Sequence, residues 1–312
     1  MPANGSLILP GDKSISHRSV MLAALSSQRS KIANISNGED VRSTISCLID
    51  CGIKIDFSKE NLFVTGGTFE QPASDLDCGN SGTTMRLLIG LLAGQGINAN
   101  FIGDKSLSNR PMDRIIEPLK RMGLNIKSNN LMPPIRISKS DLKGIDYNIP
   151  IPSAQVKSSI LLAALGANSE TKITEKVLSR DHSEIMFKNI DVNIISKDRS
   201  IKVSPCDKFS PLNIHIPADP STAAFFIGAA VLMPGSKLRV INLLLNDTRI
   251  GFLKALEKMG CSFNYYNVHE ESGEKVGDIE VIHHKLLLNI LYDDPIDIRR
   301  IPTSYLWFKA SE

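Results

Sequence analysis

Four almost wholly apolar stretches recur along the chain, each opened by a serine and each about 70 residues after the one before it. The stretches are residues 20–25, 87–93, 160–165 and 223–232, and they follow Ser14, Ser81, Ser153 and Ser221. A helix that is apolar on every side must be buried on every side. The pattern therefore predicts four interior helices, each beginning close to its serine.

A second sequence pattern has the same period: an amphipathic helix followed by a tight turn and a strand. The residues expected at this turn are Gly52, Gly123, Asp191 and Gly260. Glycine accepts the left-handed conformation that closes a helix, and aspartate tolerates it. Because the two patterns keep the same spacing over four repeats, they indicate one supersecondary unit used repeatedly.

Each unit is predicted to contain an interior helix, a strand, an amphipathic helix and a pair of strands. The amphipathic helices are expected at 42–51, 114–122, 183–190 and 250–259. The strands are expected at 31–35, 53–57, 62–65, 98–102, 125–127, 135–138, 171–174, 192–195, 201–203, 237–241, 262–266 and 279–282. This alternation is typical of an α/β fold with helices inside and sheets outside.

Composition excludes several classes of protein. The 312 residues carry a net charge of only +3, so no nucleic-acid partner is expected. The longest apolar run, 223–233, is too short to cross a bilayer, so no membrane partner is expected. No charged region followed by an apolar region opens the sequence, which predicts a cytoplasmic location. The five cysteines contain no CxxC pair, and the histidines show no metal-ligand spacing, so no metal is expected.

The unusual polar clusters all stand at predicted helix N-termini. They lie at 11–18, 79–84, 109–114, 153–157, 179–182, 219–222 and 246–249. Unpaired N–H groups and the helix dipole make such ends anion sites. Capping explains serine and asparagine there, but not two cations, Lys13 and Arg18, in one opening turn. Arg110 stands just outside a further helix, and several such helix ends could converge on a multiply charged small anion. Arg86, by contrast, lies inside an apolar helix and is expected to pair within the protein.

Two long motifs carry a resemblance to a known family. LPGDKSISHR at 9–18 and GNSGTTMRLL at 79–88 resemble the two signatures of the 3-phosphoshikimate 1-carboxyvinyltransferase (EPSP synthase) family. NRPM at 109–112, SAQVKS at 153–158 and SRDH at 179–182 follow in the order of the family's bacterial members. The resemblance covers about residues 5–282.

The resemblance implies enolpyruvyl transfer from phosphoenolpyruvate to shikimate 3-phosphate, a step of the shikimate pathway of aromatic amino acid biosynthesis, without metal or organic cofactor. It implies the enolpyruvyl transferase inverse α/β barrel, in which two lobes are each built from three βαβαββ units. By matching position, the residues expected to bind shikimate 3-phosphate are Lys13, Ser14, Arg18, Ser153 and Gln155, with Arg180 at its phosphate. Those expected to bind phosphoenolpyruvate are Lys13, Gly82, Arg110 and Gln155.

The same comparison predicts a three-unit lobe at 12–218 and a second lobe made of 1–11 and 219–312, with the strand at 6–9 belonging to the second. At about 70 residues a unit, the chain holds about four and a half units where two complete lobes need about 420 residues. The second lobe is therefore expected to be incomplete and its interior helix to expose apolar surface. A monomer is expected for the complete family fold.

No residue after about 282 matches the family's aspartate base. The catalytic residues therefore stay unknown, and Lys13 is given only as a cationic residue of the site. Two alternatives stay open at this point. One is the UDP-N-acetylglucosamine enolpyruvyl transferase family, which shares the repeat but opens with Lys-Asn in place of Lys13-Ser14. The other is a non-catalytic phosphate-ligand-binding protein derived from the enzyme.

Overall fold

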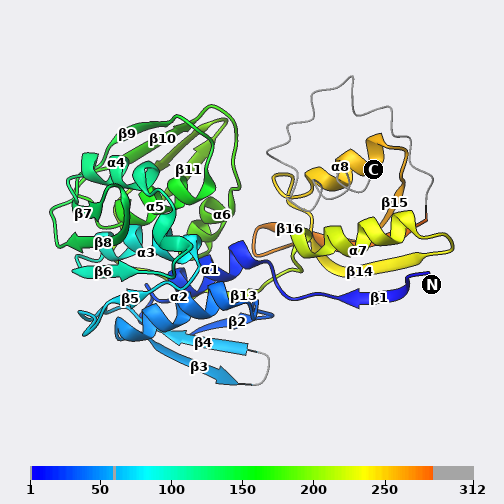
Figure 1. Ribbon diagram of the computed structural model, residues 1–312, viewed down its shortest axis with the longest axis horizontal. Helices are drawn as coiled ribbons and strands as arrows, with labels where there is room; N and C mark the ends of the chain where they lie inside the picture. The colour runs from blue at the N-terminus through cyan, green and yellow to red at the C-terminus, as the bar shows by residue number, and fades with distance from the viewer. Residues whose placement is uncertain (1, 59–60, 284–312) are drawn as a thin grey trace. The chain divides into compact units, whose positions relative to one another are not determined.

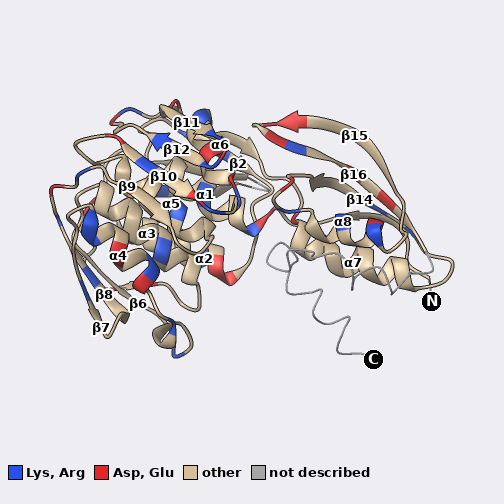
Figure 2. Cartoon of the chain, turned by 90° about the horizontal axis from the view of Figure 1, so that it is seen from above, with Lys and Arg blue, Asp and Glu red and all other residues tan. Residues whose placement is uncertain are grey.

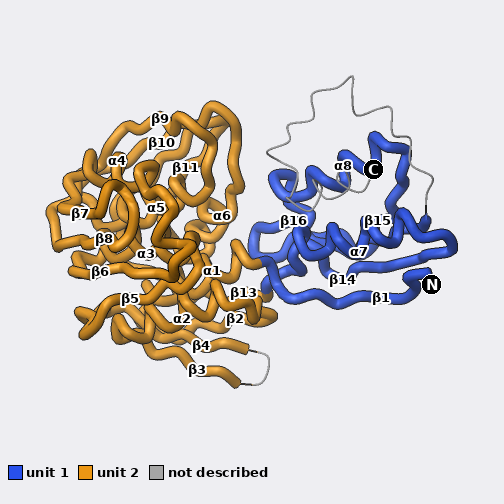
Figure 3. The backbone as a smooth tube through the Cα atoms, in the orientation of Figure 1, with its two compact units in different colours: residues 1–12, 216–312 blue, residues 13–215 orange. Residues whose placement is uncertain are grey.

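The computed structural model describes residues 2–58 and 61–283 of the chain. The chain divides into two compact units, shown in Figure 3: unit 2 is Lys13–His215, and unit 1 is Met1–Asp12 together with Ile216–Glu312. The lobes expected at 12–218 and at 1–11 with 219–312 stay a prediction. Within 2–58 and 61–283, no helix is long and apolar enough to cross a membrane.

Three predicted interior helices lie in unit 2: α1 (Lys13–Ala23), α3 (Gly82–Gly94) and α5 (Ala154–Ala164). Nearly every residue of each is buried, as their apolar sequences require. In Figure 1 the sheets of unit 2 surround these helices. At the crossing of α3 and α5, Gly90 faces Ser159 so closely that an added Cβ would lie 2.1 Å from the Ser159 carbonyl oxygen.

The amphipathic helices begin and end close to their predicted limits. They are α2 (Glu39–Asp50), α4 (Asp113–Arg121) and α6 (His182–Asn189) in unit 2, and α8 (Gly251–Lys258) in unit 1. The four residues expected to close them have positive φ angles: Gly52 84°, Gly123 98°, Asp191 62° and Gly260 94°. This confirms the turn prediction, including aspartate in the place of glycine.

Unit 2 contains three four-stranded sheets of one design. Their strand orders are β13-β2-β4-β3, β5-β6-β8-β7 and β9-β10-β12-β11, and in each the first two strands are parallel and the others antiparallel. The strands are β2 (Ser30–Ala33), β3 (Lys54–Ser58), β4 (Asn61–Thr65), β5 (Leu76–Asp77), β6 (Ala99–Ile102), β7 (Asn125–Asn129), β8 (Met132–Ser138), β9 (Asp146–Ile149), β10 (Thr171–Glu175), β11 (Ile194–Lys197), β12 (Ser200–Val203) and β13 (Asn213–His215). A single 3-10 turn, η1 (Leu107–Asn109), precedes α4.

The first strand of each sheet, namely β5, β9 or β13, was not located by the hydrophobic pattern. These strands have two, four and three residues. A window that short cannot display the alternation by which a strand is recognised.

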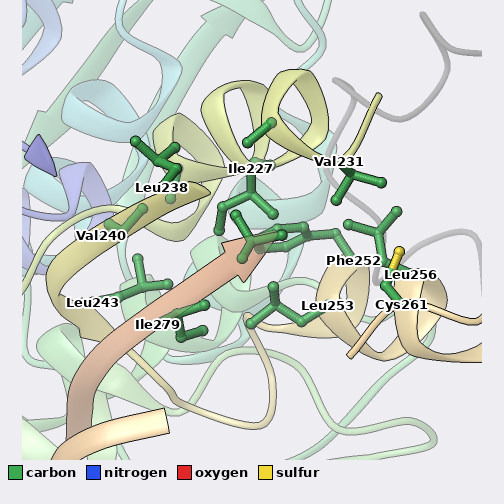
Figure 4. Packing of buried hydrophobic residues seen from close by; sticks show 14 of the residues in the cluster. Ile227, Val231, Leu238, Val240, Leu243, Phe252, Leu253, Leu256, Cys261 and Ile279 are labelled. Carbon is green, nitrogen blue, oxygen red and sulfur yellow. The ribbon is translucent and has the colours of Figure 1, made fainter. Parts of the chain in front are cut away.

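Unit 1 contains one sheet of the same design among its described residues. The order is β1 (Asn4–Ile8), β14 (Lys237–Leu244), β16 (Glu274–Ile282) and β15 (Phe263–Glu271). The fourth predicted interior helix, α7 (Pro220–Leu232), and α8 pack with β14 and β16 around an apolar core, in which Figure 4 labels residues such as Ile227, Phe252 and Ile279. α7 leaves Phe225 59% and Phe226 43% exposed, so this helix carries exposed apolar side chains. The incomplete second lobe stays a prediction.

Two strands belong to a different unit from the helix that follows them in the chain. β1 precedes α1 but pairs parallel with β14 in unit 1, as the family comparison predicts for residues 6–9, whereas β13 precedes α7 but pairs with β2 in unit 2. At the edge of unit 1 the outgoing and returning segments pair with each other, because the Asp12 N–H donates to Pro217 O at 2.8 Å. Buried Arg249 contacts Asp12 at 2.5 Å and Asp219 at 3.0 Å. This ion cluster therefore fixes both crossings to unit 1.

A β-bulge in β14 depends on the carboxylate of Asp278. The register shifts between Val240 and Leu243, and Asn242 has φ 49°. Asp278 accepts from the Asn242 N–H at 2.9 Å and from Arg239 and Asn267. Burial alone would raise the pKa of Asp278, but these hydrogen bonds outweigh it and lower the pKa.

Replacing Asp278 by asparagine is expected to destabilise the protein by about 2 kcal/mol at neutral pH, because charge-assisted hydrogen bonds are lost. A lowered pKa means that the native state binds fewer protons, so this stabilisation is complete above the ordinary pKa of 3.8 and is lost as the pH falls through the lower native value. Urea unfolding from pH 7 to pH 3 should show wild type and variant converging in acid. Asp247→Asn, which breaks an exposed pair with Lys254, is the control and should cost under about 0.5 kcal/mol. A pH-independent difference at Asp278 would contradict the assignment.

Candidate functional site

Arg18 lies one turn into α1 and is only 4% exposed. Its Nε donates to Ser183 Oγ at 2.8 Å and its Nη2 to Ser158 Oγ at 2.7 Å. Its Nη1 donates to the Ser14 carbonyl oxygen at 2.9 Å. These partners are hydroxyl and carbonyl oxygens, and together they fix the orientation of the guanidinium. The side chain thus joins α1, α5 and α6.

Arg180 reaches the same helix end from the segment before α6. Its Nη1 donates to Ser14 Oγ at 2.8 Å. Ser14 therefore accepts from Arg180 through its hydroxyl and from Arg18 through its carbonyl. Two guanidinium groups meet at the first turn of α1, where unpaired N–H groups and the helix dipole also favour an anion.

The first turn of α5 carries two predicted site residues. Ser153 caps the helix, since its Oγ accepts from the Val156 N–H at 3.4 Å. Gln155 accepts from Arg86 Nη1 through its Oε1 at 2.8 Å and donates through its Nε2 to Thr83 Oγ1 at 2.8 Å. Arg86 therefore pairs within the protein as expected, and its partner is itself a predicted site residue.

Gly82 opens α3 beside two arginines. A Cβ built on Gly82 would lie 2.8 Å from Arg86 Nη1 and 3.6 Å from Arg110 Nη1. Arg110 is held in place by Asn80, since its Nη2 donates to Asn80 Oδ1 at 2.6 Å and its Nη1 to Asn80 O at 3.2 Å. The absence of a side chain at Gly82 therefore leaves room between the helix end and two cations.

Arginines outnumber carboxylates around Arg86, since Arg114 and Arg110 act on it against Asp113; Figure 2 colours Lys and Arg blue and Asp and Glu red along the chain. Burial lowers the pKa of Arg86, and the nearby cations Arg114 and Arg110 lower it further. Like charges held together in a partly buried setting disfavour one another until an anion enters. The group around Gly82 is thus suited to bind an anion.

Lys13 is the first residue of α1 and its side chain is 52% exposed. Its Nζ lies 2.9 Å from Asp40 Oδ2 at the start of α2. His17, on the next turn, is fully buried and its Nδ1 contacts Thr44 Oγ1 at 2.7 Å. His17 therefore joins α1 to α2, while Lys13 remains accessible for a ligand.

Six of the eight predicted residues, all but Lys13 and Ser153, thus fall into two groups that the first turn of α5 joins. One group is Ser14, Arg18 and Arg180; the other is Gly82, Arg110 and Gln155. Sequence reasoning missed Ser158 and Ser183, which hold Arg18, and treated Arg86 as internal. The signal for Ser158 was available, since a hydroxyl inside an otherwise apolar helix needs a partner. In the parts of the chain that the structure describes, no group of three or more His, Cys, Asp or Glu side chains could hold a metal ion.

Helix ends, arginines and a small-residue turn collected in this way form a site suited to small polyanions, in a protein built from repeated α/β units. Comparison with known families matches residues 1–306 to EPSP synthase (3-phosphoshikimate 1-carboxyvinyltransferase). The chain belongs to this family, which decides against the UDP-N-acetylglucosamine enolpyruvyl transferase alternative.

Individual relatives agree with the family match. A 3-phosphoshikimate 1-carboxyvinyltransferase of Thermodesulfovibrio yellowstonii is 45% identical over 282 residues, which are 88% of this chain and 66% of the relative. One from Streptococcus pyogenes is 40% identical over 291 residues, 91% of this chain and 68% of the relative. The chain therefore spans about two thirds of the length of these relatives.

Solved structures agree as well. An EPSP synthase structure from Acinetobacter baumannii, at 37% identity, superimposes with a TM-score of 0.83 and covers 90% of this chain and 66% of its own. A second structure from that organism, at 35% identity, gives 0.87 over 99% and 71%. These matches confirm the predicted fold class of repeated α/β units.

Proposed function

We propose that this chain binds shikimate 3-phosphate and phosphoenolpyruvate and takes part in the enolpyruvyl transfer that gives 5-enolpyruvylshikimate 3-phosphate and phosphate. The observation that carries the proposal is the convergence, within unit 2, of Arg18 and Arg180 on Ser14. Each substrate has a carboxylate and a phosphate, and such groups suit bidentate arginines at helix N-termini.

Each of the two groups of residues is proposed to bind one of the two substrates. Ser14, Arg18 and Arg180 are proposed to bind shikimate 3-phosphate, and Gly82, Arg110 and the neighbouring Arg86 to bind phosphoenolpyruvate. Gln155 would contact both ligands, since α5 lies in contact with both groups. Fixing two anions side by side turns a bimolecular reaction into one between oriented partners.

The reaction then needs three changes. The methylene carbon of phosphoenolpyruvate gains a proton, and the positive charge develops on the adjacent carbon. The shikimate 5-hydroxyl oxygen attacks that carbon and loses its proton, which gives a tetrahedral intermediate. The intermediate loses phosphate from the same carbon and a proton from the methyl group, which restores the carbon–carbon double bond, now in the enol ether of shikimate 3-phosphate. An acid–base group must carry these protons, and the family's aspartate base is not identified in this chain; Lys13 is proposed as a cationic contact to both substrates.

One experiment tests the proposal. Calorimetric titration of the full chain with shikimate 3-phosphate, then with phosphoenolpyruvate in its presence, is combined with an assay for released phosphate. Binding with turnover supports the enzyme, and binding without turnover supports the non-catalytic phosphate-ligand-binding alternative. Failure to bind shikimate 3-phosphate would refute the site. The predicted cytoplasmic location and monomeric state stay predictions.

Replacing Gly82 by alanine is expected to weaken phosphoenolpyruvate binding about tenfold, or about 1.4 kcal/mol. The new Cβ would displace the Arg86 guanidinium, 2.8 Å away, and intrude beside Arg110. The Kd for shikimate 3-phosphate should change less than about threefold, since Ser14, Arg18 and Arg180 are held by other contacts. Equal effects on the two ligands, measured by calorimetry, would refute the placement of phosphoenolpyruvate at Gly82.

A further inference from the structure

A buried ion cluster lies in unit 2 and belongs to none of the predicted site residues. Lys157 on α5 places its Nζ 2.9 Å from Glu175 Oε2 and 2.7 Å from Glu184 Oε1. The side chains are 1%, 1% and 5% exposed. Burying three ionisable groups costs free energy that three apolar side chains of similar size would not. The cluster therefore calls for a role other than stability.

One arm of the cluster leads to Arg180. Glu175 ends β10, and its second oxygen, Oε1, accepts from the Ser179 N–H at 3.2 Å and from the Ser179 hydroxyl at 2.5 Å. Ser179 is the residue before Arg180, whose guanidinium contacts Ser14. One carboxylate is thus held by Lys157 on one side and fixes the backbone next to Arg180 on the other.

The other arm leads to Arg18. Glu184 lies in the first turn of α6, directly after Ser183, and Ser183 Oγ accepts from Arg18 Nε. Ser158, the residue after Lys157, accepts from Arg18 Nη2 and contacts Ser183 Oγ at 2.6 Å. Burial raises the pKa of Glu184 although Lys157 opposes this, so the contact with Lys157 is maintained at a cost.

We propose that Lys157, through Glu175 and Glu184, is a positioning residue that sets the places of Arg180 and Arg18 for an anionic ligand. The inference rests on the function proposed above. Arg180 directly follows Ser179, which Glu175 holds, and Arg18 donates to Ser183, which directly precedes Glu184 in α6. A shift of the Lys157 ammonium would therefore move both guanidinium groups. No part of the cluster touches the ligand; it acts only through the two arginines and their serines.

The sharpest test uses Glu175, because two variants separate its charge from its contact with Ser179. Glu175→Ala removes the acceptor, while Lys157 keeps Glu184 as its partner. Glu175→Gln keeps an oxygen that can accept from Ser179, but it removes the charge and turns an NH2 group toward the Lys157 ammonium, so the ion pair with Lys157 is lost. Lys172→Met is the matched control: Lys172 lies on β10 like Glu175, and the substitution breaks an exposed ion pair with Asp146 of β9.

Two quantities are measured on the full chain, below the onset of thermal unfolding: the Kd for shikimate 3-phosphate, and hydrogen exchange of the peptide covering residues 176–182. Glu175→Ala should weaken binding about tenfold, the effect of misplacing a charge-assisted contact, and should speed exchange of this peptide. Lys172→Met should stay within about twofold of wild type with unchanged exchange, and Glu175→Gln, which loses Lys157 but can keep Ser179, should fall between the control and Glu175→Ala. If Glu175→Ala does not fold, Ser179→Ala, which removes only the hydroxyl donor, should give the same changes at about threefold.

The outcomes are distinguishable. A folded Glu175→Ala variant with wild-type Kd and wild-type exchange would overturn the inference, since the cluster would then contribute to stability alone. Equal weakening in Glu175→Ala and Glu175→Gln would overturn the route through Ser179. If wild type itself does not bind shikimate 3-phosphate, the proposed function fails, and the exchange of residues 176–182 still decides whether Glu175 holds the Arg180 segment in place.

Discussion

Alanine at Gly90 is expected to destabilise unit 2 by about 3 kcal/mol, the upper range for overpacking a core. The added Cβ would lie 2.1 Å from the Ser159 carbonyl oxygen and 2.8 Å from the Ser159 carbonyl carbon. Both are backbone atoms of α5, so no change of rotamer relieves the contact. The only response is to move α3 away from α5, which opens the packing of two helices that are buried nearly all round.

The measurement is urea unfolding of wild type and variant, followed by circular dichroism. Gly38→Ala is the matched control, because a Cβ there would meet only Ser36 Oγ at 3.6 Å and its φ of −63° is open to any residue. The control should change the free energy of unfolding by less than about 1 kcal/mol. A Gly90→Ala variant as stable as wild type would show that α3 and α5 do not approach as closely as described.

This contact also shows what the hydrophobic pattern can and cannot predict. The pattern places α3 and α5 inside because both are apolar all round, and the regular period places the left-handed residues that end the outer helices. It does not reveal that Gly90 makes the closest approach, because the closeness depends on which faces of two distant segments meet. The first strands of the sheets were not predicted for a different reason: a strand as short as β5 is recognised only from its pairing with β6.

The same distinction applies to the site. The cations at helix ends stand out in the sequence because a cap does not need them, and on this ground Arg18 was predicted. Lys157 belongs to the polar cluster at 153–157 but received no role from the sequence, because its two carboxylate partners come from β10 and α6. Which buried charges pair over long sequence distances is decided by the fold, and the period of the sequence does not predict it.

Methionine at Arg18 is expected to weaken the binding of shikimate 3-phosphate by at least about a hundredfold, or about 3 kcal/mol, which lies in the range for removing one partner of a buried charge pair. The variant should nevertheless fold. Methionine has a similar length and fills the space of the arginine stem, and Ser158 and Ser183 still contact each other at 2.6 Å after the guanidinium is gone. Ser158 also retains its hydrogen bond to the Ala154 carbonyl oxygen at 2.6 Å. The buried hydroxyls are therefore not left without partners, and the cost falls on the ligand.

Calorimetry with shikimate 3-phosphate measures the effect, with thermal unfolding as the check on folding. Arg29→Met, which removes a guanidinium that stacks on the Phe63 ring at 4.0 Å, is the matched control and should leave the Kd unchanged. Arg18→Lys separates charge from geometry: a lysine keeps the cation but cannot donate to Ser158, Ser183 and the Ser14 carbonyl at once, so it should recover only part of the affinity. Full recovery with lysine would mean that charge alone, and not the orientation imposed by α5 and α6, makes this end of α1 an anion site. Wild-type affinity in a folded Arg18→Met variant would remove Arg18 from the site.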